Sequence, residues 1–235
     1  FYWLVVASLK IFGGFSELAA RLPAALMAIG SVLMTALASA RLFGARTGFW
    51  SGIVMGTSII LMYMGKASVT DSTLLFFMTA ALFSFIHRQY WLMYLACGLA
   101  VMTKGPIGVV FPAGIVFFYL LATRQLELLF RMHVLRGLLL IVVVGLPWYL
   151  YMYNIHGMAF IYEFIGFHNV SRFTAPLHPV RAHWWFYLPV VILGFFPWTG
   201  LLIQSVKNAF RHSFGEEAQL LTFFQAWWIF VLIFF

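Results

Sequence analysis

The chain has few charged residues and almost no cysteine. Asp, Glu, Lys and Arg make up 9% of its 235 residues, and the single cysteine, Cys97, lies within an apolar stretch. One cysteine excludes an internal disulfide framework and a cysteine-based metal site. We expect Cys97 to be a small, buried core residue. So little charge also excludes a soluble globular domain, in which about a quarter of the residues are charged.

Apolar residues take the place of the missing charge. Hydrophobic residues make up 64% of the chain and aromatic residues 20%, and the mean hydropathy is +0.98. Because a membrane-spanning helix needs about 20 mainly apolar residues, we predict an all-α fold, a polytopic transmembrane helical bundle with about seven to eight spans. Residues 1–235 would form part of a single transmembrane domain. The sequence starts at Phe1 and stops inside an apolar run, so we expect a fragment truncated at both ends.

Breaks in the apolar pattern predict where the helices lie. Residues 1–14 are too short for a span and carry Lys10, which is typical of an interfacial helix. Ser16 and Glu17 are suited to start a helix that runs to about residue 42. The segment 156–182 is the one long polar stretch and predicts a loop outside the membrane. Further spans are expected at roughly 48–65, 72–87, 90–103, 106–122, 134–154, 183–206 and 218–235.

Successive turns between the predicted spans lie on alternate sides of the membrane, and basic residues occur on both sides. By the positive-inside rule, the side with more of them is cytoplasmic, and membrane lipids rather than nucleic acid are the expected partner of these dispersed charges. The outer side also carries cations, which the rule disfavours there, and binding an anion is the simplest reason for them. The inner set is Arg41, Arg46, Arg88, Arg124, Arg131, Arg136, Lys207 and Arg211. The outer set is Lys10, Arg21, Lys66, Lys104, Arg172 and Arg181, together with Glu17, Asp71 and Glu163.

Asp71 stands where one predicted span gives way to the next on the outer side. It would be suited to cap the helix that begins at Ser72. It would equally be suited to lie at the rim of a cavity and orient a nucleophile or a sugar hydroxyl. The two interpretations are compatible, and the residue pattern leaves both open.

Lys104 lies between two apolar spans and is followed by Gly105-Pro106. A lysine in this position can extend along the helix to the interface. The Gly-Pro pair also breaks the helix and frees backbone polar groups, which suits a site for an anionic head group. Arg21 and Lys10 would serve in the same way or contact lipid phosphate.

The predicted outer loop contains Glu163, His168, Arg172, His178 and His183. These histidines form no His-X-His or His-X-X-X-His pair, so we expect no metal site. Arg172 is the better candidate for gripping a phosphate, because its planar donor groups match phosphate oxygens.

An ordered set of short motifs resembles the ArnT-like branch of the protein O-mannosyltransferase superfamily, whose members are GT-C glycosyltransferases. The branch includes the aminoarabinose transferase that modifies lipid A. Individual motifs are short, but the set covers nearly the whole chain. The motifs are Tyr2-Trp3, Ala20-Arg21-Leu22-Pro23, Arg41-Leu42-Phe43-Gly44, Thr70-Asp71, Met102-Thr103-Lys104-Gly105-Pro106, Leu146-Pro147-Trp148-Tyr149, His168-Asn169-Val170-Ser171-Arg172-Phe173, Trp185-Phe186-Tyr187-Leu188-Pro189 and Pro197-Trp198.

The resemblance implies an enzyme of the bacterial inner membrane with its active face in the periplasm. Such an enzyme transfers a sugar from a polyprenyl-phosphate carrier, with inversion, to a lipid, glycan or protein acceptor, and we expect it to need no cofactor. Asp71 matches a catalytic acidic position of the family. Lys104, His168 and Arg172 match positions that we assign to the donor phosphate, with Arg21 or Lys10 in support. A first catalytic carboxylate would precede Phe1.

One position departs from the family pattern, and one other class of protein competes with an enzyme. The family usually has Glu immediately before the outer-loop histidine, whereas this chain has Phe167. A transporter or lipid flippase would also place charges and broken helices inside a bundle. Transporters, however, usually show internal repeats and charges near the bilayer midplane, while the charges here gather at one face. A membrane scaffold without activity would have no need for Asp71 and Lys104 at adjacent helix breaks.

Overall fold

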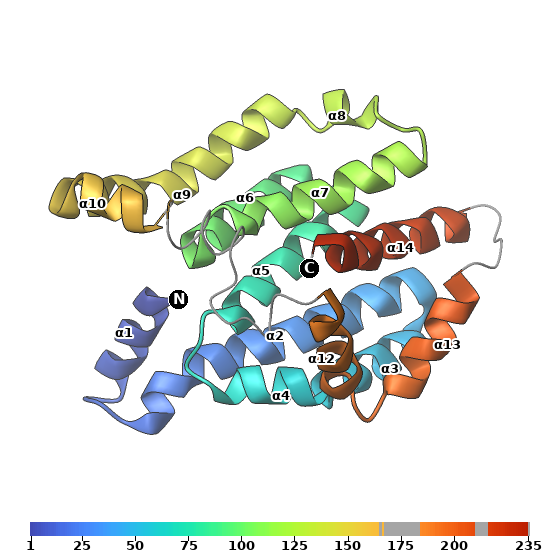
Figure 1. Ribbon diagram of the computed structural model, residues 1–235, viewed down its shortest axis with the longest axis horizontal. Coiled ribbons are helices and arrows are strands. Elements are labelled where there is room, and N and C mark those ends of the chain that lie inside the picture. Colours follow the sequence, from blue (N-terminus) through green and yellow to red (C-terminus); the bar gives the residue numbers. More distant parts are fainter. Residues whose placement is uncertain (165, 167–183, 210–215, 235) are drawn as a thin grey trace.

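The structure is a computed structural model that describes residues 1–164, 166, 184–209 and 216–234. All regular secondary structure in these residues is helical, and the helices pack into one bundle (Figure 1). The predicted all-α bundle is confirmed. The elements are α1 (Tyr2–Ile11), α2 (Glu17–Phe43), α3 (Ala45–Gly56), α4 (Ile59–Lys66), α5 (Asp71–Ile86), α6 (Tyr90–Lys104), α7 (Ile107–Ala122), α8 (Leu128–Arg131), α9 (Val134–His156), α10 (Met158–Ile161), the short 3-10 helix η3 (Trp184–Phe186), α12 (Tyr187–Gly194), α13 (Thr199–Ala209) and α14 (Glu216–Phe234).

Few of these helices reach the full thickness of a bilayer on their own. By length and composition α2 and α9 are able to cross a membrane, and the number rises to at most four in the described part of the chain if two bent helix pairs each count as one span. Helices α5 and α7 are 16 residues long, or about 24 Å. The expected seven to eight spans exceed this count because the expectation treated such shorter helices as full spans.

The expected spans at 48–65 and 183–206 correspond, in the described residues, to two bent helix pairs. The chain direction changes by 61° between α3 and α4, and by 113° between α12 and α13. The bends hold each other: the backbone N–H of Ile59 donates to the Phe196 carbonyl at 3.2 Å, and the Trp198 indole donates to Thr57 Oγ1 at 2.7 Å. Each break in the helical hydrogen-bond pattern therefore finds polar partners in the other pair.

Small residues let neighbouring helices approach closely. A Cβ atom on Gly48 of α3 would lie 2.4 Å from the Ala40 side chain of α2, and one on Gly108 of α7 would lie 2.4 Å from the Ala100 backbone of α6. Such contacts at small residues are a common way for helices to pack in membranes. The contact at Gly108 holds α6 and α7 together directly beside Lys104.

An aromatic core joins α5, α6, α7 and α14. The rings of Phe85 and Phe223 stack with their centroids 5.6 Å apart, and Tyr119 packs edge-on against both. Cys97 lies in the same core with 3% of its surface exposed, as its apolar surroundings predicted. Large aromatic side chains of this kind bury much apolar area and fix the relative position of the four helices.

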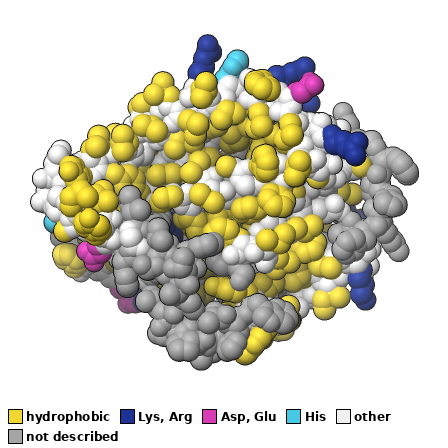
Figure 2. Space-filling view, turned by 45° about the horizontal axis from the view of Figure 1, so that its top comes forward, with side chains coloured by type: hydrophobic (Ala, Val, Ile, Leu, Met, Phe, Trp, Pro, Cys, Tyr) yellow, Lys and Arg dark blue, Asp and Glu magenta, His cyan; other side chains and the backbone are white. Residues whose placement is uncertain are grey.

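The helix ends define two ends of the bundle. At one end, which we expect to face outward and call the outer end, α2, α5 and α7 begin and α4, α6 and α9 end (Figure 1). At the opposite end, called the inner end, α2, α5 and α7 end and α3, α6 and α9 begin. On the face drawn in Figure 2, hydrophobic side chains form a broad central area, and the visible Lys and Arg side chains lie mainly toward its edges. The alternating direction of these helices thus supports the assignment of the described basic residues to two opposite ends of the bundle.

Replacement of Gly108 by alanine tests the close α6–α7 contact. The added methyl group meets backbone atoms, which cannot move aside as a flexible side chain can, so we expect Gly108→Ala to destabilise the fold by about 1–3 kcal/mol. Gly200→Ala is the matched control, since a Cβ there meets nothing within 4 Å. Thermal unfolding in detergent measures both variants, and equal stability of the two would contradict the packing described here.

Cysteine labelling tests the orientation of the bundle. Glu163 lies beyond the outer end of α9 and Glu127 precedes α8 at the inner end, and both are exposed. Because Cys97 is buried, it is a silent background. We expect a membrane-impermeant maleimide to label Glu163→Cys in intact cells, and Glu127→Cys only after permeabilisation. The reverse pattern would invert the assignment of the outer end.

Candidate functional site

Asp71 and Lys104, 33 residues apart, form an ion pair at the outer end of the bundle. The Lys104 ammonium nitrogen lies 2.6 Å from the Asp71 Oδ1 atom, and the two side chains are 43% and 37% exposed. The capping interpretation of Asp71 is wrong: Thr70 is the N-cap residue of α5 and makes no side-chain capping bond, while Asp71 is the first residue of the helix. Its carboxylate is therefore held by a lysine from the next helix.

Local sequence explains why the two charges meet. Helix α6 ends at Lys104 because Gly105 adopts a φ of +87°, a conformation that few other residues accept. Asp71 lies at the positive end of the α5 dipole and Lys104 at the negative end of the α6 dipole, so both positions favour the charge that they carry. Helices α5 and α6 run antiparallel, which brings these two ends together.

Tyr149 of α9 holds the end of α6 in place. Its hydroxyl donates to the Val101 carbonyl at 2.7 Å, and that oxygen also accepts the Gly105 backbone N–H at 2.8 Å. The bond fixes the last turn of α6, which carries Lys104. Tyr149 belongs to the Leu146-Pro147-Trp148-Tyr149 motif, but no role was assigned to it from the sequence. Its position two residues after Pro147 in an apolar helix was the feature that could have indicated one.

An aromatic hollow lies next to the end of α6. Trp3 of α1 packs edge-on against Trp148 of α9, with 5.9 Å between ring centroids. The hollow has a volume of about 240 Å³ and reaches Met102, two residues before Lys104. Its other lining residues are Phe1, Tyr2 and Val6. An apolar hollow lined by aromatic side chains suits an apolar ligand or the apolar part of a larger one.

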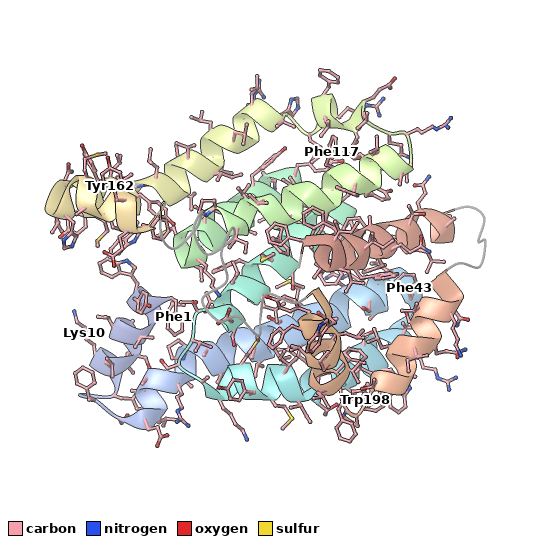
Figure 3. The ribbon with its side chains drawn as sticks, viewed as in Figure 1. Phe1, Lys10, Phe43, Phe117, Tyr162 and Trp198 are labelled. Atoms are coloured by element: carbon pink, nitrogen blue, oxygen red, sulfur yellow. The ribbon has the colours of Figure 1, made fainter. Side chains whose placement is uncertain are left out.

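The structure places Arg21 and Lys10 at the same end but does not bring them into contact with the ion pair. Arg21 pairs with Glu17, one turn earlier in α2, at 2.6 Å. The Ser68 hydroxyl donates to the Ala20 carbonyl at 2.9 Å, which ties the segment before α5 to the start of α2. Lys10 lies in the last turn of α1 and points away from the rest of the bundle (Figure 3).

Two expected site residues, His168 and Arg172, lie outside the described residues, as does Phe167. Their assignment to the donor phosphate stays a prediction. Within the part of the chain that the structure describes, no three His, Cys, Asp or Glu side chains are grouped closely enough to hold a metal ion.

These features define an integral membrane protein of the polytopic helical class. Residues 1–151 match the family described as dolichyl-phosphate-mannose-protein mannosyltransferase. The chain belongs to this family. The resemblance inferred from the motifs is thereby confirmed at the level of the family.

Individual relatives match over most or all of the chain. An uncharacterized protein of Aquifex aeolicus is 31% identical over 100% of this chain and 46% of its own length. The undecaprenyl phosphate-alpha-4-amino-4-deoxy-L-arabinose arabinosyl transferase of Pectobacterium carotovorum is 30% identical over 87% of this chain and 40% of its own length. The chain thus spans about half the length of the relatives that it matches.

A solved structure shares the fold. The crystal structure of ArnT from Cupriavidus metallidurans bound to undecaprenyl phosphate is 25% identical in sequence and superposes with a TM-score of 0.85. The match covers 99% of this chain and 44% of the ArnT chain. The described bundle therefore has the GT-C architecture that the motifs predicted.

The exposure of the ion pair predicts that it contributes little to stability. Ion pairs between exposed side chains contribute about 0–1 kcal/mol. We expect Asp71→Asn and Lys104→Met each to unfold within about 1 kcal/mol of the parent, as measured by thermal unfolding in detergent. A loss of several kcal/mol in either variant would show that the pair is a structural element of the bundle.

Proposed function

We propose that the chain is part of the membrane domain of a glycosyltransferase that uses a sugar linked to polyprenyl phosphate. The acceptor would be a lipid, glycan or protein at the periplasmic face of a bacterial inner membrane. The observation that carries the proposal is the likeness to an ArnT structure bound to undecaprenyl phosphate, over 99% of this chain. The relatives named as arabinosyl transferases point to the same chemistry.

Lys104 would stabilise the leaving group. When the glycosidic bond breaks, negative charge grows on the phosphate of the carrier, and a fixed cation beside it lowers the barrier. An ammonium group has three N–H donors, and Asp71 takes one of them. The remaining donors are free to bind a phosphate while Asp71 keeps the ammonium group in place.

Asp71 would orient the acceptor or the sugar. Its side chain is more than a third exposed, so a hydroxyl group has access to it, and only one of its two oxygen atoms accepts from Lys104. A carboxylate in this position can accept a proton or a hydrogen bond from a hydroxyl group. The pair would thus place the phosphate and a sugar hydroxyl on either side of one reacting centre.

The carrier chain and the outer loop complete the proposal. The aromatic hollow would receive part of the polyprenyl chain, because it is apolar and reaches Met102 in the last turn of α6, the turn that also carries Lys104. Arg172 and His168 would contact the donor phosphate from the loop. Arg21 and Lys10 would contribute to the positive potential of this end rather than bind the donor directly.

Substitution of Asp71 separates chemistry from folding. In the full-length parent protein, Asp71→Asn keeps the size of the side chain but removes its charge, so we expect it to fold and to lose most of its transfer activity. Transfer from a radiolabelled polyprenyl-phosphate sugar in nanodiscs measures the loss. Full activity of Asp71→Asn would exclude a catalytic role, and lipid movement without any sugar transfer by the parent would favour a transporter.

Donor titration tests the two cations. Lys104→Met and Arg172→Gln should each weaken use of the polyprenyl-phosphate donor by about 1.5–3 kcal/mol, the range for hydrogen bonds to charged groups. Arg172→Lys should recover part of that loss, since an ammonium group cannot reproduce a two-pronged contact. Lys207→Gln at the inner end is the control. If both outer variants used the donor like the parent, these cations would serve topology alone.

A further inference from the structure

The bend between α3 and α4 leaves a hollow against α2 whose lining residues include neither Asp71 nor Lys104. Its volume is about 350 Å³, within the range of small-molecule sites. Ala25, Ala28 and Val32 line it from α2, and Gly56 and Gly65 line it from the two arms of the bend. We call this hollow the α2–α4 groove. It runs over about two turns of α2, or roughly 12 Å.

The bend that forms the groove is built into the fold. The Ser58 backbone N–H donates to the Met55 carbonyl and not to the Val54 carbonyl. The Val54 carbonyl instead accepts a hydrogen bond from the Ser58 hydroxyl at 2.6 Å. On the other side of α4, a Cβ on Gly194 of α12 would lie 3.2 Å from Ile60. Helix α4 is therefore held at its angle by contacts within the chain.

The groove faces the surroundings of the bundle and not its core. Ile29 and Met62 at its edges are 54% and 47% exposed. Ile29 belongs to a helix that is able to span a membrane by length and composition, and Met62 to a bent helix pair that passes the same test; lipid chains would surround such an apolar surface. A volume of about 350 Å³ is too small to hold a turn or more of packed helix, which is about 10–12 Å across. An extended hydrocarbon chain is the occupant of matching shape.

One cation marks the outer mouth of the groove. Lys66, in the last turn of α4, lines the groove, is exposed, and has no carboxylate partner among the described residues. Arg21 lies one turn before Ala25 on the same stripe of α2, but its charge is balanced by Glu17. The mouth therefore carries a net single positive charge, which matches the single negative charge of a phosphodiester.

We propose that the α2–α4 groove binds one acyl chain of an anionic glycerophospholipid of the outer leaflet, with the phosphate of its head group on Lys66. The positive-inside rule disfavours a cation on the outer side, and binding a lipid phosphate would explain why Lys66 is there. This explanation does not involve the ion pair of Asp71 and Lys104. This site does not depend on the proposed sugar transfer, because its residues are different and its ligand is not consumed.

Native mass spectrometry of the full-length parent protein tests the site with phosphatidylglycerol and phosphatidylcholine of the same acyl chains. Lys66→Gln should weaken phosphatidylglycerol binding about fivefold, the effect of one lysine near an anionic surface, and leave phosphatidylcholine binding unchanged. Ala25→Leu fills the groove and should weaken both. Lys207→Gln and Ala122→Leu are the matched controls, at exposed positions on the inner end of the bundle.

Two results would overturn the proposal. One is that Lys66→Gln and Ala25→Leu affect phosphatidylglycerol no more than their controls do, while thermal unfolding shows all four variants to be folded. The other is that undecaprenyl phosphate displaces phosphatidylglycerol at equimolar concentration with the same dependence on Lys66 and Ala25, which would make the groove a carrier-lipid site. Loss of sugar transfer without loss of phosphatidylglycerol binding would leave the groove assignment intact and concern Asp71 and Lys104 alone.

Discussion

A hydrocarbon layer offers no hydrogen-bond partner to the peptide backbone, and this constraint determines where the helices of the bundle are allowed to break. Thr57, Ser58 and Ile59 interrupt one span, and Phe196 and Trp198 interrupt another. Two hydrogen bonds, Ile59 to Phe196 and Trp198 to Thr57, join the interruptions, and the Ser58 hydroxyl binds the Val54 carbonyl within the first one. Other breaks fall at the bundle ends, including the one at Gly105, next to the candidate site.

The same constraint explains why the residues of the candidate site lie at one end of the bundle. Charges are costly within the hydrocarbon, so Asp71 and Lys104 lie at helix ends where the dipoles favour them and where a ligand has access. Tyr149 and the close contact at Gly108 fix the end of α6 from two sides. A flexible lysine is thereby placed on a rigid support, as electrostatic stabilisation of a transition state requires.

Local patterns could be predicted from the sequence, and contacts between distant residues could not. The Gly105-Pro106 pair indicated the break after Lys104, and Ser16 indicated the start of α2; its hydroxyl accepts from the Ala19 N–H at 3.1 Å. The Asp71–Lys104 pair joins residues on different helices, so no local pattern indicates it. The bend at Thr57 could not be predicted from local sequence, because Thr57 is bonded by Trp198, which is 141 residues away. The Arg21–Glu17 ion pair could have been predicted, because Glu17 lies four residues before Arg21 on the same helix.

The central claim is that the Asp71–Lys104 pair is the reacting centre and not a clamp between two helices. The most direct test exchanges the two charges, Asp71→Lys with Lys104→Asp, in the full-length parent protein. An exchanged pair can still attract, although each charge then opposes its helix dipole, so we expect this variant to unfold within about 2 kcal/mol of the parent and to transfer no sugar from a polyprenyl-phosphate donor. Transfer at the parent rate by the exchanged variant would contradict the account.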